Sequence, residues 1–138
     1  MYKKSPAICL KRTNYTQKDS LVTCFTAKFG KDVFLARGLR KPKAKLKSAL
    51  FPLRGINLTF VKGKQFPVIT GAEIKMELTA LENNFNYHTL GLFWAEIVDL
   101  FFAEPEPHPD FFDNFLQGLQ TLNQEGKNKE AITPRAKW

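Results

Sequence analysis

Residues 21–37 read LVTCFTAKFGKDVFLAR, two runs of β-branched, aromatic and other apolar residues on either side of a short turn. The runs at 21–26 and 33–37 have the composition that is typical of β-strands. Gly30, in the segment between them, can adopt the positive φ that a short hairpin loop requires. This stretch therefore predicts a β-hairpin, and the rest of the first half extends it.

Strand-like runs continue on both sides of this hairpin. The sequence predicts one strand before it, at 7–13, and two after it, at 56–61 and 66–74, with Gly63 in the turn between the last two. The connection after the third strand is long and has room for a single helical turn at 46–50. Five short strands with one long connection after the third are the plan of an OB-fold barrel, and an SH3-like barrel is the nearest alternative.

The second half of the sequence has helical spacing from Thr79 onward. Three prolines, at 105, 107 and 109, must interrupt the helix, because each removes a backbone donor and restricts the residue before it. A second helix is predicted from Pro109 to Gly126. We therefore expect a mainly β chain with C-terminal helices (α+β), divided into an OB-fold domain at 1–78, a helical segment at 79–126 and a tail without periodicity at 127–138.

Each predicted helix carries a stripe of residues on one face, which must bury against another surface. The stripe of the second helix is broad, and self-association through it is one hypothesis. The first stripe consists of Leu81, Phe85, His88, Leu92, Ile97, Leu100 and Phe101, and the second of Phe111, Phe112, Phe115, Leu116, Leu119 and Leu122.

The net charge of +8 is unevenly distributed along the chain. Residues 1–80 hold 17 lysines and arginines against four acids, a net charge of +13, whereas residues 81–126 hold eight acids and no lysine or arginine. Solubility does not require such an asymmetry. It indicates that the basic half binds a polyanion.

The densest part of this basic half is the segment 31–64, which carries ten cations against a single acid, Asp32. Cations confined to one hairpin, one strand and one loop repel each other, and a polyanion relieves that repulsion. Six phosphate contacts would give a slope of log affinity against log salt of about −5. We predict nucleic-acid contacts from Lys31, Arg37, Arg40, Lys41, Lys43, Lys45 and Lys47, and from Lys11 and Arg12 on the first strand; the alternative is a solvated loop whose lysines only keep the chain in solution.

Aromatic side chains supply the stacking platforms of proteins that bind single-stranded nucleic acid. Strand phenylalanines point into a barrel core more often than toward a ligand. Tyr15 in the first connection and Phe29 beside Gly30 are the least core-like aromatic residues of this half. We predict base stacking at these two positions.

Several motifs occur in the same order as in a known protein family. They are YTQKDSLVTCFT at 15–26, Gly30-Lys31, ARGLRKPK at 36–43, and Leu46 followed by ALFPL at 49–53. Together they resemble the N-terminal domain of the bacterial recombination mediator RecO. Gly71-Ala72-Glu73 and the helical region extend the resemblance over most of residues 7–122.

The resemblance implies an OB-fold that binds single- and double-stranded DNA, anneals complementary strands and helps to load recombinase during DNA repair, with RecR and single-strand-binding protein as partners. It places Lys31 and Arg37 on the DNA-facing surface, which Arg40, Lys41 and Lys43 extend. Ala44 stands where family members often have a serine, and members usually have a longer helical domain, often with a cysteine zinc site. The implied location is the cytoplasm, in association with the nucleoid. Two other functions remain open: a protein-interaction module whose basic loop docks an acidic partner, and an RNA-binding OB barrel.

The sequence offers no catalytic or metal-binding motif. Cys9 and Cys24 have no neighbouring cysteine or histidine, so we expect buried, reduced thiols and no metal. Glu96 and Asp99 form no recognisable constellation with either histidine, and no phosphate-binding loop or nucleophile elbow is present. No stretch of 18 apolar residues could span a membrane. We expect a non-enzymatic binding protein without a cofactor.

Overall fold

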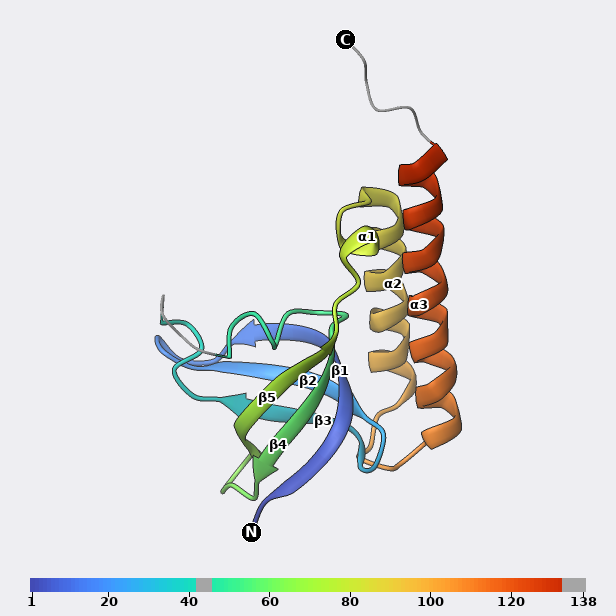
Figure 1. The fold of residues 1–138 in the computed structure, drawn as a ribbon. Coiled ribbons are helices and arrows are strands. Elements are labelled where there is room, and N and C mark those ends of the chain that lie inside the picture. The colour runs from blue at the N-terminus through green and yellow to red at the C-terminus, as the bar shows by residue number, and fades with distance from the viewer. Residues whose placement is uncertain (42–45, 133–138) are drawn as a thin grey trace.

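The computed structural model describes residues 1–41 and 46–132. Its elements are β1 (Lys3–Asn14), β2 (Ser20–Thr26), β3 (Gly30–Ala36), β4 (Gly55–Val61), β5 (Val68–Met76), α1 (Thr79–Glu82), α2 (Phe85–Phe101) and α3 (Pro109–Ile132). The strands form a closed barrel in the order β1-β2-β3-β5-β4, with the helices beside it (Figure 1). This confirms the predicted five-stranded OB-fold barrel followed by a helical segment.

The barrel closes through one short parallel pairing. All other neighbouring strands are antiparallel, whereas β3 and β5 pair in parallel at Leu35 and Val68 only, beside a hydrogen bond of 2.8 Å from Leu35 N to Pro67 O. The predicted turn in the β3–β4 connection is present, because Leu50 N donates to Leu46 O at 3.0 Å. The short seam leaves the walls on either side of it free to form surface grooves.

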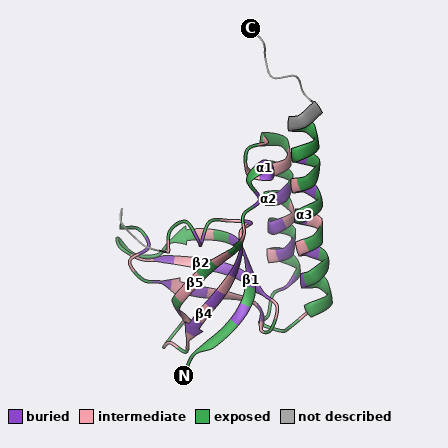
Figure 2. Ribbon diagram, viewed as in Figure 1, coloured by how far each residue is buried: buried purple, intermediate pink, exposed green. Residues whose placement is uncertain are grey.

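The barrel interior follows from the alternation of side chains along each strand. Ala7 and Cys9 of β1 and Val22 and Cys24 of β2 point inward and are at most 1% exposed. Figure 2 shows the buried parts of the strands in purple. Cys9 and Cys24 are register partners on adjacent strands, and their Sγ atoms lie 3.7 Å apart as free thiols. The hydrogen bond between them and their burial raise the pKa of Cys24 well above its ordinary value, which disfavours the reactive thiolate.

The outer face of β1 and β2 forms a second core with the helices (Figure 1). Ile8 and Leu10 of β1 and Phe25 of β2 point outward, yet they are at most 4% exposed because α2 and α3 cover them. The ring of Phe25 lies among four others, at centroid distances of 5.2 to 6.4 Å from Phe102, Phe111, Phe112 and Phe115. The helices are therefore part of the same folded unit as the barrel.

The apolar stripe of α3 belongs to this second core. Phe112, Phe115, Leu119 and Leu122 are at most 8% exposed, and only Phe111 reaches 40%. The hypothesis that this stripe mediates self-association is therefore wrong, since the barrel and α1 and α2 already cover it.

The apolar face predicted for the first helical region is wrong for its residues on α2, although Leu81 of α1 is buried. The chain breaks at Asn83–Asn84, and the Asn84 side chain caps α2 by accepting a hydrogen bond from Tyr87 N at 3.1 Å. The face of α2 that is buried holds the small residues Gly91, Ala95 and Val98, which let Leu53 approach so closely that a Cβ on Gly91 would lie 2.8 Å from it.

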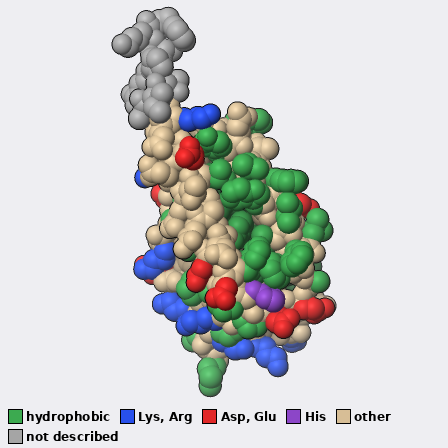
Figure 3. Space-filling view, turned by 90° about the vertical axis from the view of Figure 1, so that its right-hand side faces the viewer, with side chains coloured by type: hydrophobic (Ala, Val, Ile, Leu, Met, Phe, Trp, Pro, Cys, Tyr) green, Lys and Arg blue, Asp and Glu red, His purple; other side chains and the backbone are tan. Residues whose placement is uncertain are grey.

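Large apolar side chains consequently face outward from α2. Phe85, Phe93, Ile97, Leu100 and Phe101 are 46–81% exposed, and hydrophobic side chains gather along the helical part in Figure 3. Even so, no helix within residues 1–41 and 46–132 has the length and apolar character needed to cross a membrane.

Helix α3 does not end at Gly126 but continues to Ile132, which includes the first residues of the predicted tail. Gly126 is buried, and a Cβ there would lie 3.0 Å from the carbonyl oxygen of Ala80 in α1. The glycine thus permits close contact between two helices rather than ending one. The predicted tail from 133 to 138 lies outside the described residues.

Candidate nucleic-acid interface

A groove of about 960 Å³ runs along the outer wall of the barrel across the β3–β5 seam. We call it the wall groove. Leu35 and Arg37 border it on the β3 side, Val68 and Thr70 on the β5 side, and the β4–β5 hairpin, residues 61–66, closes one end. The hairpin contributes Lys62 and Lys64, both exposed. Three cations therefore border one groove, as a phosphate backbone requires.

Tyr15 joins two loops at this groove. Its hydroxyl donates a hydrogen bond of 3.1 Å to Gln65 Oε1, and its ring meets Phe66 edge to face at 5.7 Å. The β1–β2 loop is thereby tied to the β4–β5 hairpin across 50 residues of sequence. In OB-folds these two loops and the face of strands 2 and 3 form the oligonucleotide-binding surface. Of the two aromatic residues that line this groove, Tyr15 and Phe66, Tyr15 is the more exposed, so its ring is the better candidate for stacking.

The segment after β3 is held in place by the β1–β2 loop. Gly38 has a φ of 70°, which favours glycine, and its N–H donates to Asp19 Oδ1 at 2.7 Å. Arg40 N donates to Lys18 O at 3.0 Å, and the Arg40 guanidinium donates to Thr16 O. These bonds order the start of the basic loop, so that Arg37, Arg40 and Lys41 are exposed at one end of the barrel.

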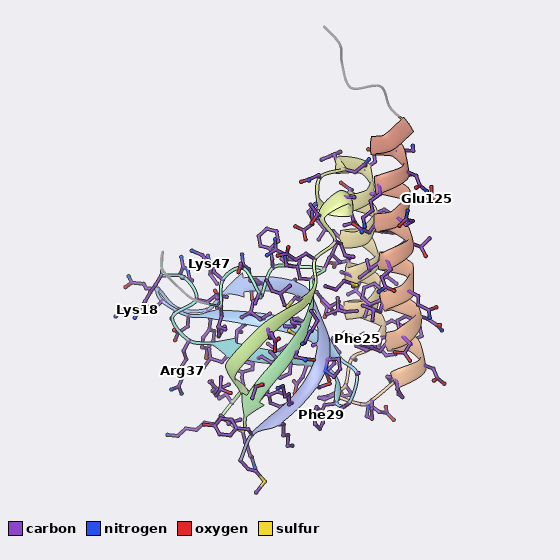
Figure 4. All side chains as sticks on the ribbon, viewed as in Figure 1. Lys18, Phe25, Phe29, Arg37, Lys47 and Glu125 are labelled. Carbon is purple, nitrogen blue, oxygen red and sulfur yellow. The ribbon has the colours of Figure 1, made fainter. Side chains whose placement is uncertain are left out.

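A smaller pocket of about 310 Å³ continues this basic surface. Arg12, Arg40 and Lys47 line it, and Arg12 Nη1 donates to Lys47 O at 3.2 Å. Figure 4 shows Lys18, Arg37 and Lys47 at the end of the barrel that points away from the helices. The structure thus brings together Arg12, Arg37, Arg40, Lys41 and Lys47. Lys43 and Lys45, also predicted to bind, lie outside the described residues.

Lys11 and Lys31 have a different environment, because both face the helices. Asp99 of α2 pairs with Lys11 Nζ at 2.8 Å and with Lys31 Nζ at 3.0 Å. Lys31 also donates to Asp99 O at 2.7 Å, and its side chain is only 13% exposed. The sequence predicts Lys31 as a nucleic-acid contact, but its ion pair with Asp99 separates it from the exposed cations of the wall groove.

The ion pairs of Asp99 should make stability depend on pH. Burial raises the pKa of Asp99, but the hydrogen bonds from Lys11 and Lys31 lower it by more, so the net pKa lies below its ordinary value. A lowered folded-state pKa contributes stability above the unfolded pKa of about 3.9, and that stability is lost as pH falls below it. We expect Asp99→Asn to lower the free energy of unfolding by about 1–3 kcal/mol at pH 7.

Urea unfolding of the wild-type protein and of Asp99→Asn across pH 2.5–7 measures this effect. The difference between their free energies of unfolding should become smaller toward pH 2.5. Glu73→Gln is the matched control, since Glu73 pairs with Lys75 at 3.1 Å but is 65% exposed. Its expected cost is below about 1 kcal/mol at every pH. An Asp99→Asn loss that is equally large at pH 2.5 would contradict the assigned ion pairs.

Lys62 and Lys64 belong to the dense cationic segment, yet they are not among the contacts predicted from the sequence. The turn at Gly63 could have identified them, because the loop between strands 4 and 5 of a five-stranded OB barrel lies at the ligand-binding face. Phe66, which packs on Tyr15, could have been found in the same way.

Within residues 1–41 and 46–132, no three histidine, cysteine or acidic side chains cluster as metal ligands would. Asp99 is engaged by two lysines, and Glu82 pairs with Arg54 at 3.1 Å. What the surface offers is cations, aromatic rings and grooves, which are the means of binding.

Comparison with known proteins agrees with this geometry. The family model "Recombination protein O N terminal" matches residues 1–77. A protein named DNA repair protein RecO from Syntrophomonas wolfei is 30% identical over 132 residues, which is 96% of this chain and 53% of that protein. Proteins of the same name from Bacillus subtilis and Syntrophus aciditrophicus are each 26% identical, over 96% and 94% of this chain and 52% and 50% of their own length. The chain thus spans about half the length of these relatives.

Proposed function

Because the chain belongs to the recombination protein O family, we propose that it binds DNA in recombinational repair through the wall groove and the adjoining basic surface. The observation that carries the proposal is the convergence of Tyr15, Arg37, Lys62 and Lys64 on one groove. Such a surface suits a sugar-phosphate backbone, with cations for phosphates and a ring for a base. The relatives carry the name DNA repair protein, which supports DNA as the polyanion.

The proposal extends to the steps that the family resemblance implies. A surface that contacts mainly phosphates binds both single strands and duplex, and it can hold two strands while they anneal. We propose annealing and assistance to recombinase loading, with RecR and single-strand-binding protein as partners, at the nucleoid in the cytoplasm. No catalytic step is part of this function.

Fluorescence anisotropy with labelled oligonucleotides at 50–300 mM salt tests DNA binding. With about six phosphate contacts, log affinity for duplex should fall against log salt with a slope of about −5 and vary little with sequence. Anisotropy that does not change as protein is added at the lowest salt concentration would contradict the proposal.

The same titration separates the two other functions. Equally tight binding of poly-glutamate would favour the protein-interaction module with an acidic partner. A clear preference for RNA over DNA of equal length would favour the RNA-binding barrel.

A further inference from the structure

A second groove of about 960 Å³ opens at the end of the barrel, on the other side of the β4–β5 hairpin from the wall groove. We call it the barrel mouth. The alternation along β3 separates the two, because Leu35 and Arg37 border the wall groove while Asp32 and Phe34 border the mouth. In Figure 4, Arg37 lies at the end of the barrel that points away from the helices, whereas Phe29 lies lower in the view and nearer to the helices.

Four aromatic rings line the mouth, those of Phe29, Phe34, Phe60 and Phe66. Phe34 and Phe60 are 1% and 6% exposed and meet at a centroid distance of 4.9 Å, so they belong to the barrel core. Phe29, partly exposed, meets Phe60 edge to face at 5.6 Å. Thr26 fixes its turn, since Thr26 Oγ1 accepts from Phe29 N at 3.0 Å and donates to Gly30 O at 2.8 Å. The Phe29 ring is thus held firmly at the edge of an open space.

Cations surround these rings. Lys3 Nζ lies 5.4 Å from the centroid of the Phe29 ring, over its face, and Lys28, Lys62 and Lys64 line the same groove. The acid of the mouth is Asp32, whose Oδ1 accepts from Val33 N at 2.8 Å. A base on Phe29 would take the place of the Lys3 ammonium, which would then be free to contact a phosphate.

We propose that the barrel mouth takes an unpaired base on Phe29, with neighbouring phosphates on Lys3, Lys28 and the hairpin lysines, and that this subsite makes the protein bind single-stranded DNA more tightly than duplex. This rests on the proposed DNA binding and adds a second subsite to it. Bases in a duplex are paired and stacked, so a base reaches a recessed ring only after it is unstacked, which costs a few kcal/mol. The cations of the wall groove, in contrast, contact phosphates of either form.

Phe29→Ala tests the proposal in titrations of the full chain with a labelled 20-nucleotide oligo-dT and a 20-base-pair duplex at one salt concentration. Loss of one stacked base costs about 1–3 kcal/mol, so single-strand affinity should fall about five- to hundredfold. Duplex affinity should stay within about twofold of wild type. Phe93→Ala is the matched control, because Phe93 is 59% exposed on α2 and borders neither groove; it should change neither affinity.

Phe29→Trp gives a second readout that does not depend on the alanine variant folding. Tryptophan also stacks, so single-strand affinity should be retained and oligo-dT, but not duplex, should quench its fluorescence relative to wild type. Unchanged single-strand affinity in Phe29→Ala, or an equal loss for both DNA forms in a folded variant, would overturn the proposal. Failure of the wild-type protein to bind any DNA would instead overturn the proposed function itself.

Discussion

Replacing Phe25 with alanine is expected to lower the free energy of unfolding by about 3–5 kcal/mol. The side chain is 0% exposed and lies outside the barrel wall, where it contacts rings from α3 and from the end of α2. Its removal leaves a cavity at the junction of barrel and helices, and rigid strands on one side limit how far the site can collapse. Because a small domain is stable by only about 5–15 kcal/mol, the variant should be strongly destabilised.

Urea unfolding followed by circular dichroism measures this loss as a lower midpoint concentration of urea, with an unchanged dependence of the unfolding free energy on urea. Phe85→Ala is the control, since it removes the same atoms from a side chain that is 81% exposed. Its expected effect is within about 0.5 kcal/mol. Equal effects of the two substitutions would mean that the helices do not bury the outer face of β2.

The triple variant Arg37→Ala, Lys62→Ala, Lys64→Ala is expected to lose about 500-fold in duplex affinity at 0.1 M salt. Each phosphate contact contributes about 0.9 to the slope of log affinity against log salt, so three contacts contribute about 2.7. At 0.1 M salt, one decade below the 1 M reference, this corresponds to nearly three decades of affinity. The loss should be similar for all sequences, because phosphate contacts carry no sequence information.

A matched variant separates local contacts from net charge. Lys75→Ala, Lys127→Ala, Lys129→Ala also removes three positive charges, but these lysines lie on β5 and α3 and border neither the wall groove nor the barrel mouth. Its affinity should stay within about tenfold of wild type, because exposed charges farther from the DNA than the Debye length of about 10 Å are screened. Similar losses in both variants would show that the protein attracts DNA by overall charge alone.

The barrel was predictable because its determinants are local. Alternation and turn glycines at Gly30 and Gly63 mark the hairpins, and the long connection after the third strand distinguishes the topology. The helices were less predictable. Gly126 suggested the end of a helix, but Gly126 and Gly91 are both sites of close contact with residues distant in sequence. In the sequence, a glycine that makes room for another segment looks the same as a glycine that a turn requires. Only the structure shows which segment packs against it.

The candidate site was predictable in composition but not in arrangement. The sequence indicated that the basic half binds a polyanion, and it selected Tyr15 and Arg37, which the structure places on one groove. It gave no reason to separate Lys31 from Arg37, because the carboxylate that engages Lys31 lies 68 residues away. Nor did it show that Lys62 and Lys64 stand between two grooves.

By itself, the sequence determined the five strands, the two helical stretches that prolines separate, and the separation of charge between the halves. Periodicity, turn residues and charge can be read from neighbouring residues. The tertiary structure alone decided which cations are exposed together, which two are paired with Asp99, and which aromatic rings border an open groove. The physical reason is that residues tens of positions apart in the sequence come within hydrogen-bonding distance only when the barrel closes and the helices cover one side of it. Only that closure determines whether a lysine meets a carboxylate or remains free for a phosphate.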